Sequence, residues 1–159
     1  MSLSTDPLLE RVRMLDELNA HLTFRISHMS KLLELEGMQR LAGTGFNLTA
    51  YRMMLVIRIC GEISVSDLSR IMVIDRAQIS RAATDLIDRG LLEGRADSKS
   101  KRKKLLALSG AGDRAYLDLR ARFDQREAKI EAEVGEDLNA LWRSIDRISR
   151  YLEAETATG

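Results

Sequence analysis

Residues 64–112 have the sequence SVSDLSRIMVIDRAQISRAATDLIDRGLLEGRADSKSKRKKLLALSGAG, and this stretch decides the fold. Two short segments within it each begin with a side chain that can cap a helix. Ser64 stands three positions before a carboxylate, and Asp75 stands three positions before Gln78, spacings that are typical of a capping box. Because only Val73-Ile74 separates the segments, the stretch predicts two short helices joined by a tight turn, a helix-turn-helix.

The apolar positions of these two helices recur every three or four residues, so each helix is expected to have one buried face. Gly90 directly follows the second helix, Asp75–Arg89, and suits a left-handed helix end. The residues expected to be buried are Leu68, Ile71 and Met72 in the first helix and Ile79, Ala82 or Ala83, Leu86 and Ile87 in the second.

After Gly90 the apolar pattern changes from a helical period to alternation. Leu91–Arg95 and Lys104–Leu108 are predicted strands, and the polar segment Ala96–Lys103 is the expected hairpin tip. A two-stranded hairpin placed directly after a helix-turn-helix forms a wing. The fold is therefore expected to be mainly α with a small β-hairpin wing, a winged helix-turn-helix.

Positive charge is concentrated in the same region. The whole chain has a formal net charge of +1, whereas residues 76–104 carry 9 basic and 4 acidic side chains, a local sum of +5. Six of these basic residues lie within Arg95–Lys104, against one acid. A basic footprint on an otherwise neutral protein indicates a surface that faces phosphate groups.

Helices are predicted on the N-terminal side of this region. A stripe of apolar residues predicts one long helix over 8–36, and Gly37, Gly43 and Gly45 mark a break after it. A second helix, from Ala50 to about Ile59, is apolar on nearly every side. That pattern is typical of a helix buried in the centre of a domain.

Two more helices are predicted on the C-terminal side. Ser109–Gly112 opens a long helix that extends to about Val134, and Gly135 separates it from a last helix. A heptad-like apolar seam runs along the last helix. Its members are Leu138, Leu141, Ile145, Ile148 and Leu152.

The terminal helices carry more apolar surface than the small central lobe can cover. Leaving that surface in water costs free energy in proportion to its area, and a two-fold dimer is the commonest way to bury it. We therefore expect a homodimer. Residues 1–47 and 109–159 are expected to form a helical dimerisation region, attached to a winged helix-turn-helix lobe at residues 48–108.

The composition excludes several classes of protein. The chain has one cysteine, which permits neither an internal disulfide nor a cysteine metal cluster. It has no phosphate-binding glycine loop, no metal-ligand spacing and no histidine placed with a nucleophile, so we expect no enzyme, no cofactor and no metal. With no signal peptide and no apolar run long enough for a membrane span, a cytoplasmic protein without a membrane partner is expected.

These elements, in this order, resemble the MarR family of transcription regulators. The resemblance rests on Leu48-Thr49 at the second helix, DRAQISR at Asp75–Arg81, LIDRGLL at Leu86–Leu92 and DSKSKRKKLLALSGAG at Asp97–Gly112. It covers about residues 15–152. It implies a transcription regulator that binds double-stranded DNA as a homodimer, in the manner of a ligand-responsive repressor on a pseudo-palindromic site.

The first turns of the helix at Asp75–Arg89 are the expected recognition surface, because side chains at the start of such a helix reach base edges in the major groove. Arginine pairs with guanine, glutamine with adenine, and an alanine methyl with a thymine methyl. The expected DNA contacts here are Arg76, Ala77, Gln78, Ser80 and Arg81. The alternative is an ordinary solvated helix face.

The basic wing is expected to anchor phosphates through Lys99, Lys101 and Arg102. The resemblance implies that Asp97 and Arg102 pair across the hairpin and hold its shape. Where many family members have a second arginine and a second acid, this chain has Lys99 and Ser100, and lysine lacks the planar fork of arginine. Phosphate anchoring is therefore favoured over minor-groove insertion. A winged helix that binds a protein is the alternative, although lysine is disfavoured at protein interfaces.

A ligand site is a further hypothesis. His21, Arg25 and His28 follow helical spacing, and the resemblance implies a pocket for a small aromatic or phenolic ligand between the dimer arms and the lobe. Met29 and Met53 are candidates for its apolar wall, since methionine adapts to varied ligands. The alternative is a polar strip beside ordinary core methionines.

Cys60 is a candidate redox sensor, because some relatives sense peroxide through a cysteine. The reactive cysteine of those relatives corresponds to the early part of the first helix, where this chain has Leu22-Thr23-Phe24. Cys60 instead ends the predicted buried helix, where cysteine usually acts as a small apolar residue. The structural role is the one we expect.

Overall fold

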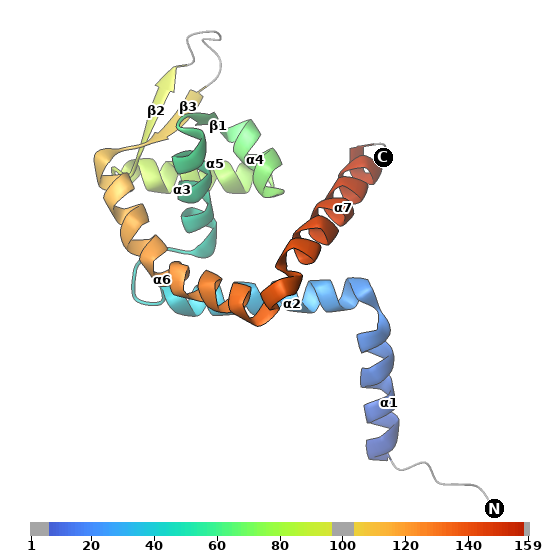
Figure 1. Ribbon diagram of the computed structural model, residues 1–159. Helices are drawn as coiled ribbons and strands as arrows, with labels where there is room; N and C mark the ends of the chain where they lie inside the picture. The colour runs from blue at the N-terminus through green and yellow to red at the C-terminus, as the bar shows by residue number, and fades with distance from the viewer. Residues whose placement is uncertain (1–6, 97–103, 158–159) are drawn as a thin grey trace, which may run out of the picture. The chain divides into compact units, whose positions relative to one another are not determined.

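A computed structural model describes residues 7–96 and 104–157 of the chain, and its helices and strands are shown in Figure 1. The chain divides into two compact units, Met1–Tyr116 and Leu117–Gly159. Most of the described residues are helical, with one small antiparallel sheet, so the predicted fold class is confirmed. The division falls inside a helix, and the assignment of the terminal helices to dimerisation stays a prediction.

The first unit begins with two helices, α1 (Pro7–Ala20) and α2 (Leu22–Leu41). The prediction of a single helix over 8–36 is wrong, because His21 has extended backbone angles of φ −84° and ψ 112°. Gly37 lies within α2, which continues four residues beyond it. The apolar stripe runs through His21 without interruption, so hydrophobic periodicity alone does not detect a break of one residue.

The third helix, α3 (Leu48–Cys60), lies at the centre of the first unit. Asn47 caps its start by accepting a hydrogen bond from the backbone N–H of Ala50 at 2.8 Å. Met53, Met54 and Ile57 are almost completely buried, as the apolar sequence of this helix predicts. Burial of such side chains stabilises the fold by about 1.5–3 kcal/mol each.

The helix-turn-helix consists of α4 (Val65–Met72) and α5 (Arg76–Asp88), and both predicted caps are confirmed. The hydroxyl of Ser64 accepts from the backbone N–H of Asp67, and the carboxylate of Asp75 accepts from the N–H groups of Ala77 and Gln78.

The predicted buried faces of these helices are largely confirmed. Leu68, Ile79, Ala83 and Leu86 are at most 3% exposed, whereas Met72, Ala82 and Ile87 are only half-buried. Ile71 was expected in the core and is 55% exposed, so that prediction is wrong. In this helix of 8 residues Leu68 is the buried residue, and no neighbouring element in the described part of the chain covers Ile71.

Three antiparallel strands lie in the order β1-β3-β2, and the helices of the lobe pack beside them (Figure 1). The strands are β1 (Ile63–Ser64), β2 (Leu92–Ala96) and β3 (Lys104–Leu108). β2 and β3 form the predicted hairpin, within one residue of the expected bounds. β1 was missed, because two residues are too few to show an alternating pattern.

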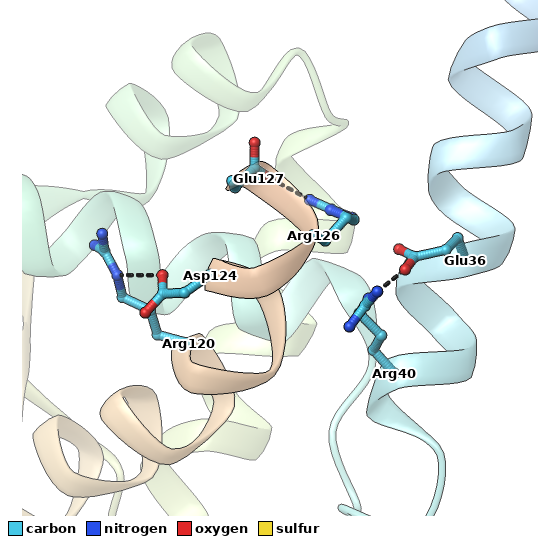
Figure 2. A network of polar contacts seen from close by, with 6 residues as sticks. All are labelled: Glu36, Arg40, Arg120, Asp124, Arg126 and Glu127. Carbon is cyan, nitrogen blue, oxygen red and sulfur yellow. Dashed lines mark hydrogen bonds and ion pairs between the residues drawn. The ribbon is translucent and has the colours of Figure 1, made fainter. Parts of the chain in front are cut away.

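The C-terminal helices are α6 (Gly110–Val134) and α7 (Leu138–Ala157), separated by a 3₁₀ turn at Gly135–Asp137 as the sequence predicts. Two ion pairs lie on α6 (Figure 2). Arg120 and Asp124 are one helical turn apart, and Arg126 and Glu127 are adjacent in sequence. The Glu36–Arg40 pair on α2 also spans one helical turn. Pairs of this kind contribute only a few tenths of a kcal/mol each.

The helical ends of the chain expose many large apolar side chains. On α7 none of the described residues is buried, and Leu141, Trp142, Ile145 and Leu152 are 39–54% exposed. In the first unit, Leu15, Leu18, Leu22 and Met29 of α1 and α2 are exposed as well. Exposed apolar patches of this kind mark interaction surfaces, and the homodimer predicted from the sequence would cover them.

Candidate nucleic-acid interface

Helix α5 presents the predicted recognition residues on its exposed side. Its inner face is fixed in the core by Ile79, Ala83 and Leu86. The residues predicted to contact DNA from this helix are all exposed, namely Arg76, Ala77, Gln78, Ser80 and Arg81. The cap at Asp75 satisfies the backbone N–H groups of Ala77 and Gln78, so the first turn is helical up to its N-terminal end.

A shallow depression of about 410 Å³ lies along the same helix. It is lined by Ala77, Ser80, Arg81 and Thr84. Thr84 was not among the predicted contacts, although it continues the helical spacing of Ala77 and Ser80 by one turn. Its hydroxyl donates a hydrogen bond to the carbonyl of Ser80 at 3.1 Å. Helical periodicity was the signal that could have found it.

The C-terminal end of α5 is fastened to the rest of the first unit. The guanidinium of Arg89 lies 4.2 Å above the ring of Phe46 and also pairs with the carboxylate of Asp85 at 3.2 Å. Arg89 is one of the basic residues counted in 76–104, but its guanidinium group already contacts Phe46 and Asp85. Cation–π contacts of this kind contribute about 0.5–1 kcal/mol at exposed sites.

The base of the wing contains a second engaged arginine. Arg95 lies 3.3 Å from a carboxylate oxygen of Glu62 and 3.1 Å from one of Glu93. Hydrogen bonding and attraction to Glu93, with a smaller contribution from Glu62, raise the pKa of Arg95 above its already high ordinary value. Two carboxylates thus balance this positive charge locally.

The tip of the wing lies outside the described residues. The predicted contacts Lys99, Lys101 and Arg102 fall there, and so does Asp97, which was expected to pair with Arg102. These four assignments remain predictions.

The wing, α5 and α6 meet at a tight junction. Ser109 donates its hydroxyl to the carbonyl of Gly90 at 2.7 Å and caps α6 by accepting from the backbone N–H of Gly112 at 2.9 Å. A Cβ atom on Gly112 would lie 2.0 Å from the carbonyl oxygen of Leu91, so only glycine permits this approach. The junction therefore joins the C-terminal end of α5, the base of the wing and the start of α6.

The residues proposed for a ligand pocket are not gathered in one cavity. His21, Arg25, His28 and Met29 are exposed in the α2 region, but Met53 is 0% exposed within the core. The core encloses Met53 in this chain, and the assignment of these five residues to a ligand stays a prediction.

Two of these residues do have aromatic or apolar neighbours. The rings of Phe24 and His28 meet edge to face with centroids 6.1 Å apart. His21 joins Met14, Glu17 and Leu18 around a depression of about 350 Å³.

Cys60 is exposed, so the expectation that it acts as a buried apolar residue is wrong. The last turn of α3, from Arg58 to Cys60, extends past the core and carries all three side chains into solvent. Exposure makes the thiol accessible to small oxidants.

The described residues include neither a membrane-spanning helix nor a metal-binding cluster. Within residues 7–96 and 104–157, none of the helices has the length and apolar character needed to cross a membrane. In the same part of the chain, no group of three or more His, Cys, Asp or Glu side chains is arranged to hold a metal ion.

Comparison with solved structures shows the same fold in MarR family regulators. A MarR family regulator from Silicibacter pomeroyi is 21% identical, with a TM-score of 0.77 over 97% of each chain. The M. tuberculosis regulator MOSR in complex with DNA is 20% identical, with a TM-score of 0.69 over 84% of this chain and 97% of its own.

CouR from Rhodococcus jostii, bound to p-coumaroyl-CoA, is 22% identical, with a TM-score of 0.72 over 80% of this chain and 90% of its own. No curated protein matches the chain. Residues 44–103 match the model of the MarR family, and they include the capped α5 helix and the strand β2. That match and the shared fold confirm the predicted resemblance to the MarR family.

Proposed function

We propose that this protein is a transcription regulator that binds double-stranded DNA by sequence. One observation carries the proposal. The capped start of α5 presents two arginines, a glutamine, a serine and an alanine, all exposed, on a helix whose opposite face is fixed in the core. This set can donate to guanine and adenine edges and contact thymine methyl groups in a major groove.

The comparisons support the same function. MOSR shares the fold and was solved with DNA bound. The chain also has its excess of basic side chains in residues 76–104, where the resemblance puts the recognition helix and the wing. A winged-helix protein that binds another protein through this surface would be expected to expose aromatic residues there, and residues 75–104 contain none.

The functional unit in this proposal is a homodimer that acts as a ligand-responsive repressor. The exposed apolar residues of α1, α2 and α7 supply the surface that a second copy would cover. Two-fold symmetry would then give a pseudo-palindromic site with half-sites about 34 Å apart, one helical turn.

A small aromatic or phenolic ligand is the proposed effector. CouR, which shares the fold, was solved with p-coumaroyl-CoA. The exposed His21, Arg25, His28 and Met29 are the residues of this chain that we assign to such a ligand. A ligand that binds one lobe spacing better than another would shift the population away from the DNA-binding form.

The exposed thiol of Cys60 supports a second candidate, regulation by peroxide. Release of DNA on addition of peroxide, abolished in the Cys60→Ser variant, is the expected result for that candidate. DNA binding that is insensitive to peroxide in both proteins would exclude it.

Titration of labelled duplex that flanks the protein's own gene tests the DNA-binding function. We expect the wild-type chain to retard this duplex in a gel against an excess of unrelated DNA, and the Arg81→Ala variant to lose that preference. A wild-type chain that is competed equally by any duplex would contradict sequence-specific binding.

A further inference from the structure

The two basic side chains of the described wing strands lie on opposite faces of the hairpin. Gly94 pairs with Leu106, and Arg95 pairs with Leu105. Directly paired residues share a face, and faces alternate along a strand. Leu106 is 1% exposed and faces the core, so Gly94 and Lys104 lie on the inner face of the hairpin, while Arg95 lies on the outer face.

These two cations also differ in their partners. Arg95 is engaged by Glu62 and Glu93, as described above. Lys104 is exposed, and among the described residues no carboxylate forms an ion pair with it. It belongs to the outermost described pair of the hairpin, Ala96 with Lys104, beyond the residues that β1 covers. As far as the described residues go, its charge is therefore left for an external anion.

Gly94 leaves the space that the Lys104 side chain occupies. A Cβ atom on Gly94 would be 2.0 Å from Cε and 2.9 Å from Nζ of Lys104. The lysine stem therefore lies across the Cα of Gly94, in space that any other residue would fill. A side chain that already lies along the strand where it binds has less conformational freedom to lose than one that extends into solvent.

We propose that Lys104 is a further DNA-contact residue, whose side chain lies over Gly94 on the inner face of the wing and binds a backbone phosphate through its ammonium group. This inference rests on the proposed DNA-binding function. Lys104 lies in the described strand β3, whereas the DNA contacts Lys99 and Lys101 of the wing tip are predicted from sequence alone. As a lysine, it anchors phosphate as a point charge and does not read bases.

The salt dependence of duplex binding tests this assignment. Each phosphate that a cation neutralises contributes about −0.9 to the slope of log K against log salt concentration. In the full-length Lys104→Gln variant we expect the slope to become shallower by about 0.9 for each bound protomer. The matched Arg95→Gln variant removes a charge from the other face of the same hairpin and should keep the wild-type slope.

The Gly94→Ala variant tests the role of the glycine. The atoms that a new Cβ would meet are at the far end of a flexible side chain, so the lysine should move aside and the thermal midpoint should stay unchanged. We expect this variant to have weaker binding, and we expect no additional weakening when the substitution is made in the Lys104→Gln background.

Two outcomes would overturn the inference. A wild-type slope in Lys104→Gln would show that this lysine contacts no phosphate. Equal weakening by Gly94→Ala with and without Lys104 would show that the glycine does not act through the lysine. A wild-type chain that binds no duplex at any salt concentration would instead contradict the proposed function itself.

Discussion

Val73 occupies the turn between α4 and α5 with φ +51° and ψ +44°, a left-handed conformation that a β-branched residue rarely adopts. Its side chain is 90% exposed and gains almost nothing from packing. The left-handed conformation costs a non-glycine residue about 1–2 kcal/mol. We therefore expect Val73→Gly to raise the free energy of unfolding by about 1 kcal/mol, measured by urea denaturation.

The opposite substitution provides the control. Gly90 ends α5 with φ +70° and open space around it, so Gly90→Ala should be destabilising through backbone strain alone. A loss of stability in Val73→Gly would contradict the assignment of strain to this turn.

Residue-level features that depend on local sequence could be predicted, and those that depend on distant packing could not. The caps at Ser64 and Asp75 follow from spacings of three residues, and both are present. The exposure of Ile71 depends on which neighbouring element covers α4, and the exposure of Cys60 depends on how far α3 extends past the core. Neither property is encoded in the periodicity of a single helix.

At the scale of elements, the junction of the wing with α6 depends on Gly112. Because a Cβ there would meet a backbone carbonyl at 2.0 Å, Gly112→Ala should lower the free energy of unfolding by about 1–3 kcal/mol, measured by urea denaturation. Gly110→Ala is the matched control on the same turn. Its new Cβ would meet nothing closer than 3.8 Å, so equal destabilisation by both variants would contradict the steric explanation.

The recognition helix and the wing are expected to contribute differently to binding. Gln78→Ala should change sequence preference, with a loss of about 1–3 kcal/mol of discrimination at one base pair. Lys101→Ala should weaken binding to every duplex alike, because a phosphate contact carries no sequence information. Anisotropy titrations against a panel of single-base variants measure both effects. Uniform loss of affinity in both variants would contradict this division.

Elements with a clear period were predicted to within about two residues, and the exceptions are short or interrupted. The hairpin β2–β3, α3, α5 and the Gly135 break all lie where the sequence places them. β1 has only two residues, and the break at His21 involves one extended residue in a continuous apolar stripe. A periodic pattern needs several residues to be recognised, so neither a strand of two residues nor a break of one residue can be predicted from it.

At the scale of the whole molecule, the exposed apolar side chains of α7 should drive dimerisation. The Leu141→Asp/Ile145→Asp double variant places two charges on that surface and should sediment as a monomer at concentrations where the wild type is a dimer. The Arg143→Asp variant changes a charge on the same helix without removing an apolar residue and should stay dimeric. A wild-type monomer at micromolar concentration would contradict the homodimer.

In the proposed dimer, two copies of α5 read a two-fold symmetric duplex. Selection of bound sequences from a random duplex pool by the full-length protein measures this symmetry. We expect enrichment of a pseudo-palindrome whose half-sites are centred about 34 Å apart, and loss of a specified base pair in each half when Arg81→Ala is used. A pool that shows no enrichment, or a single site without symmetry, would contradict it.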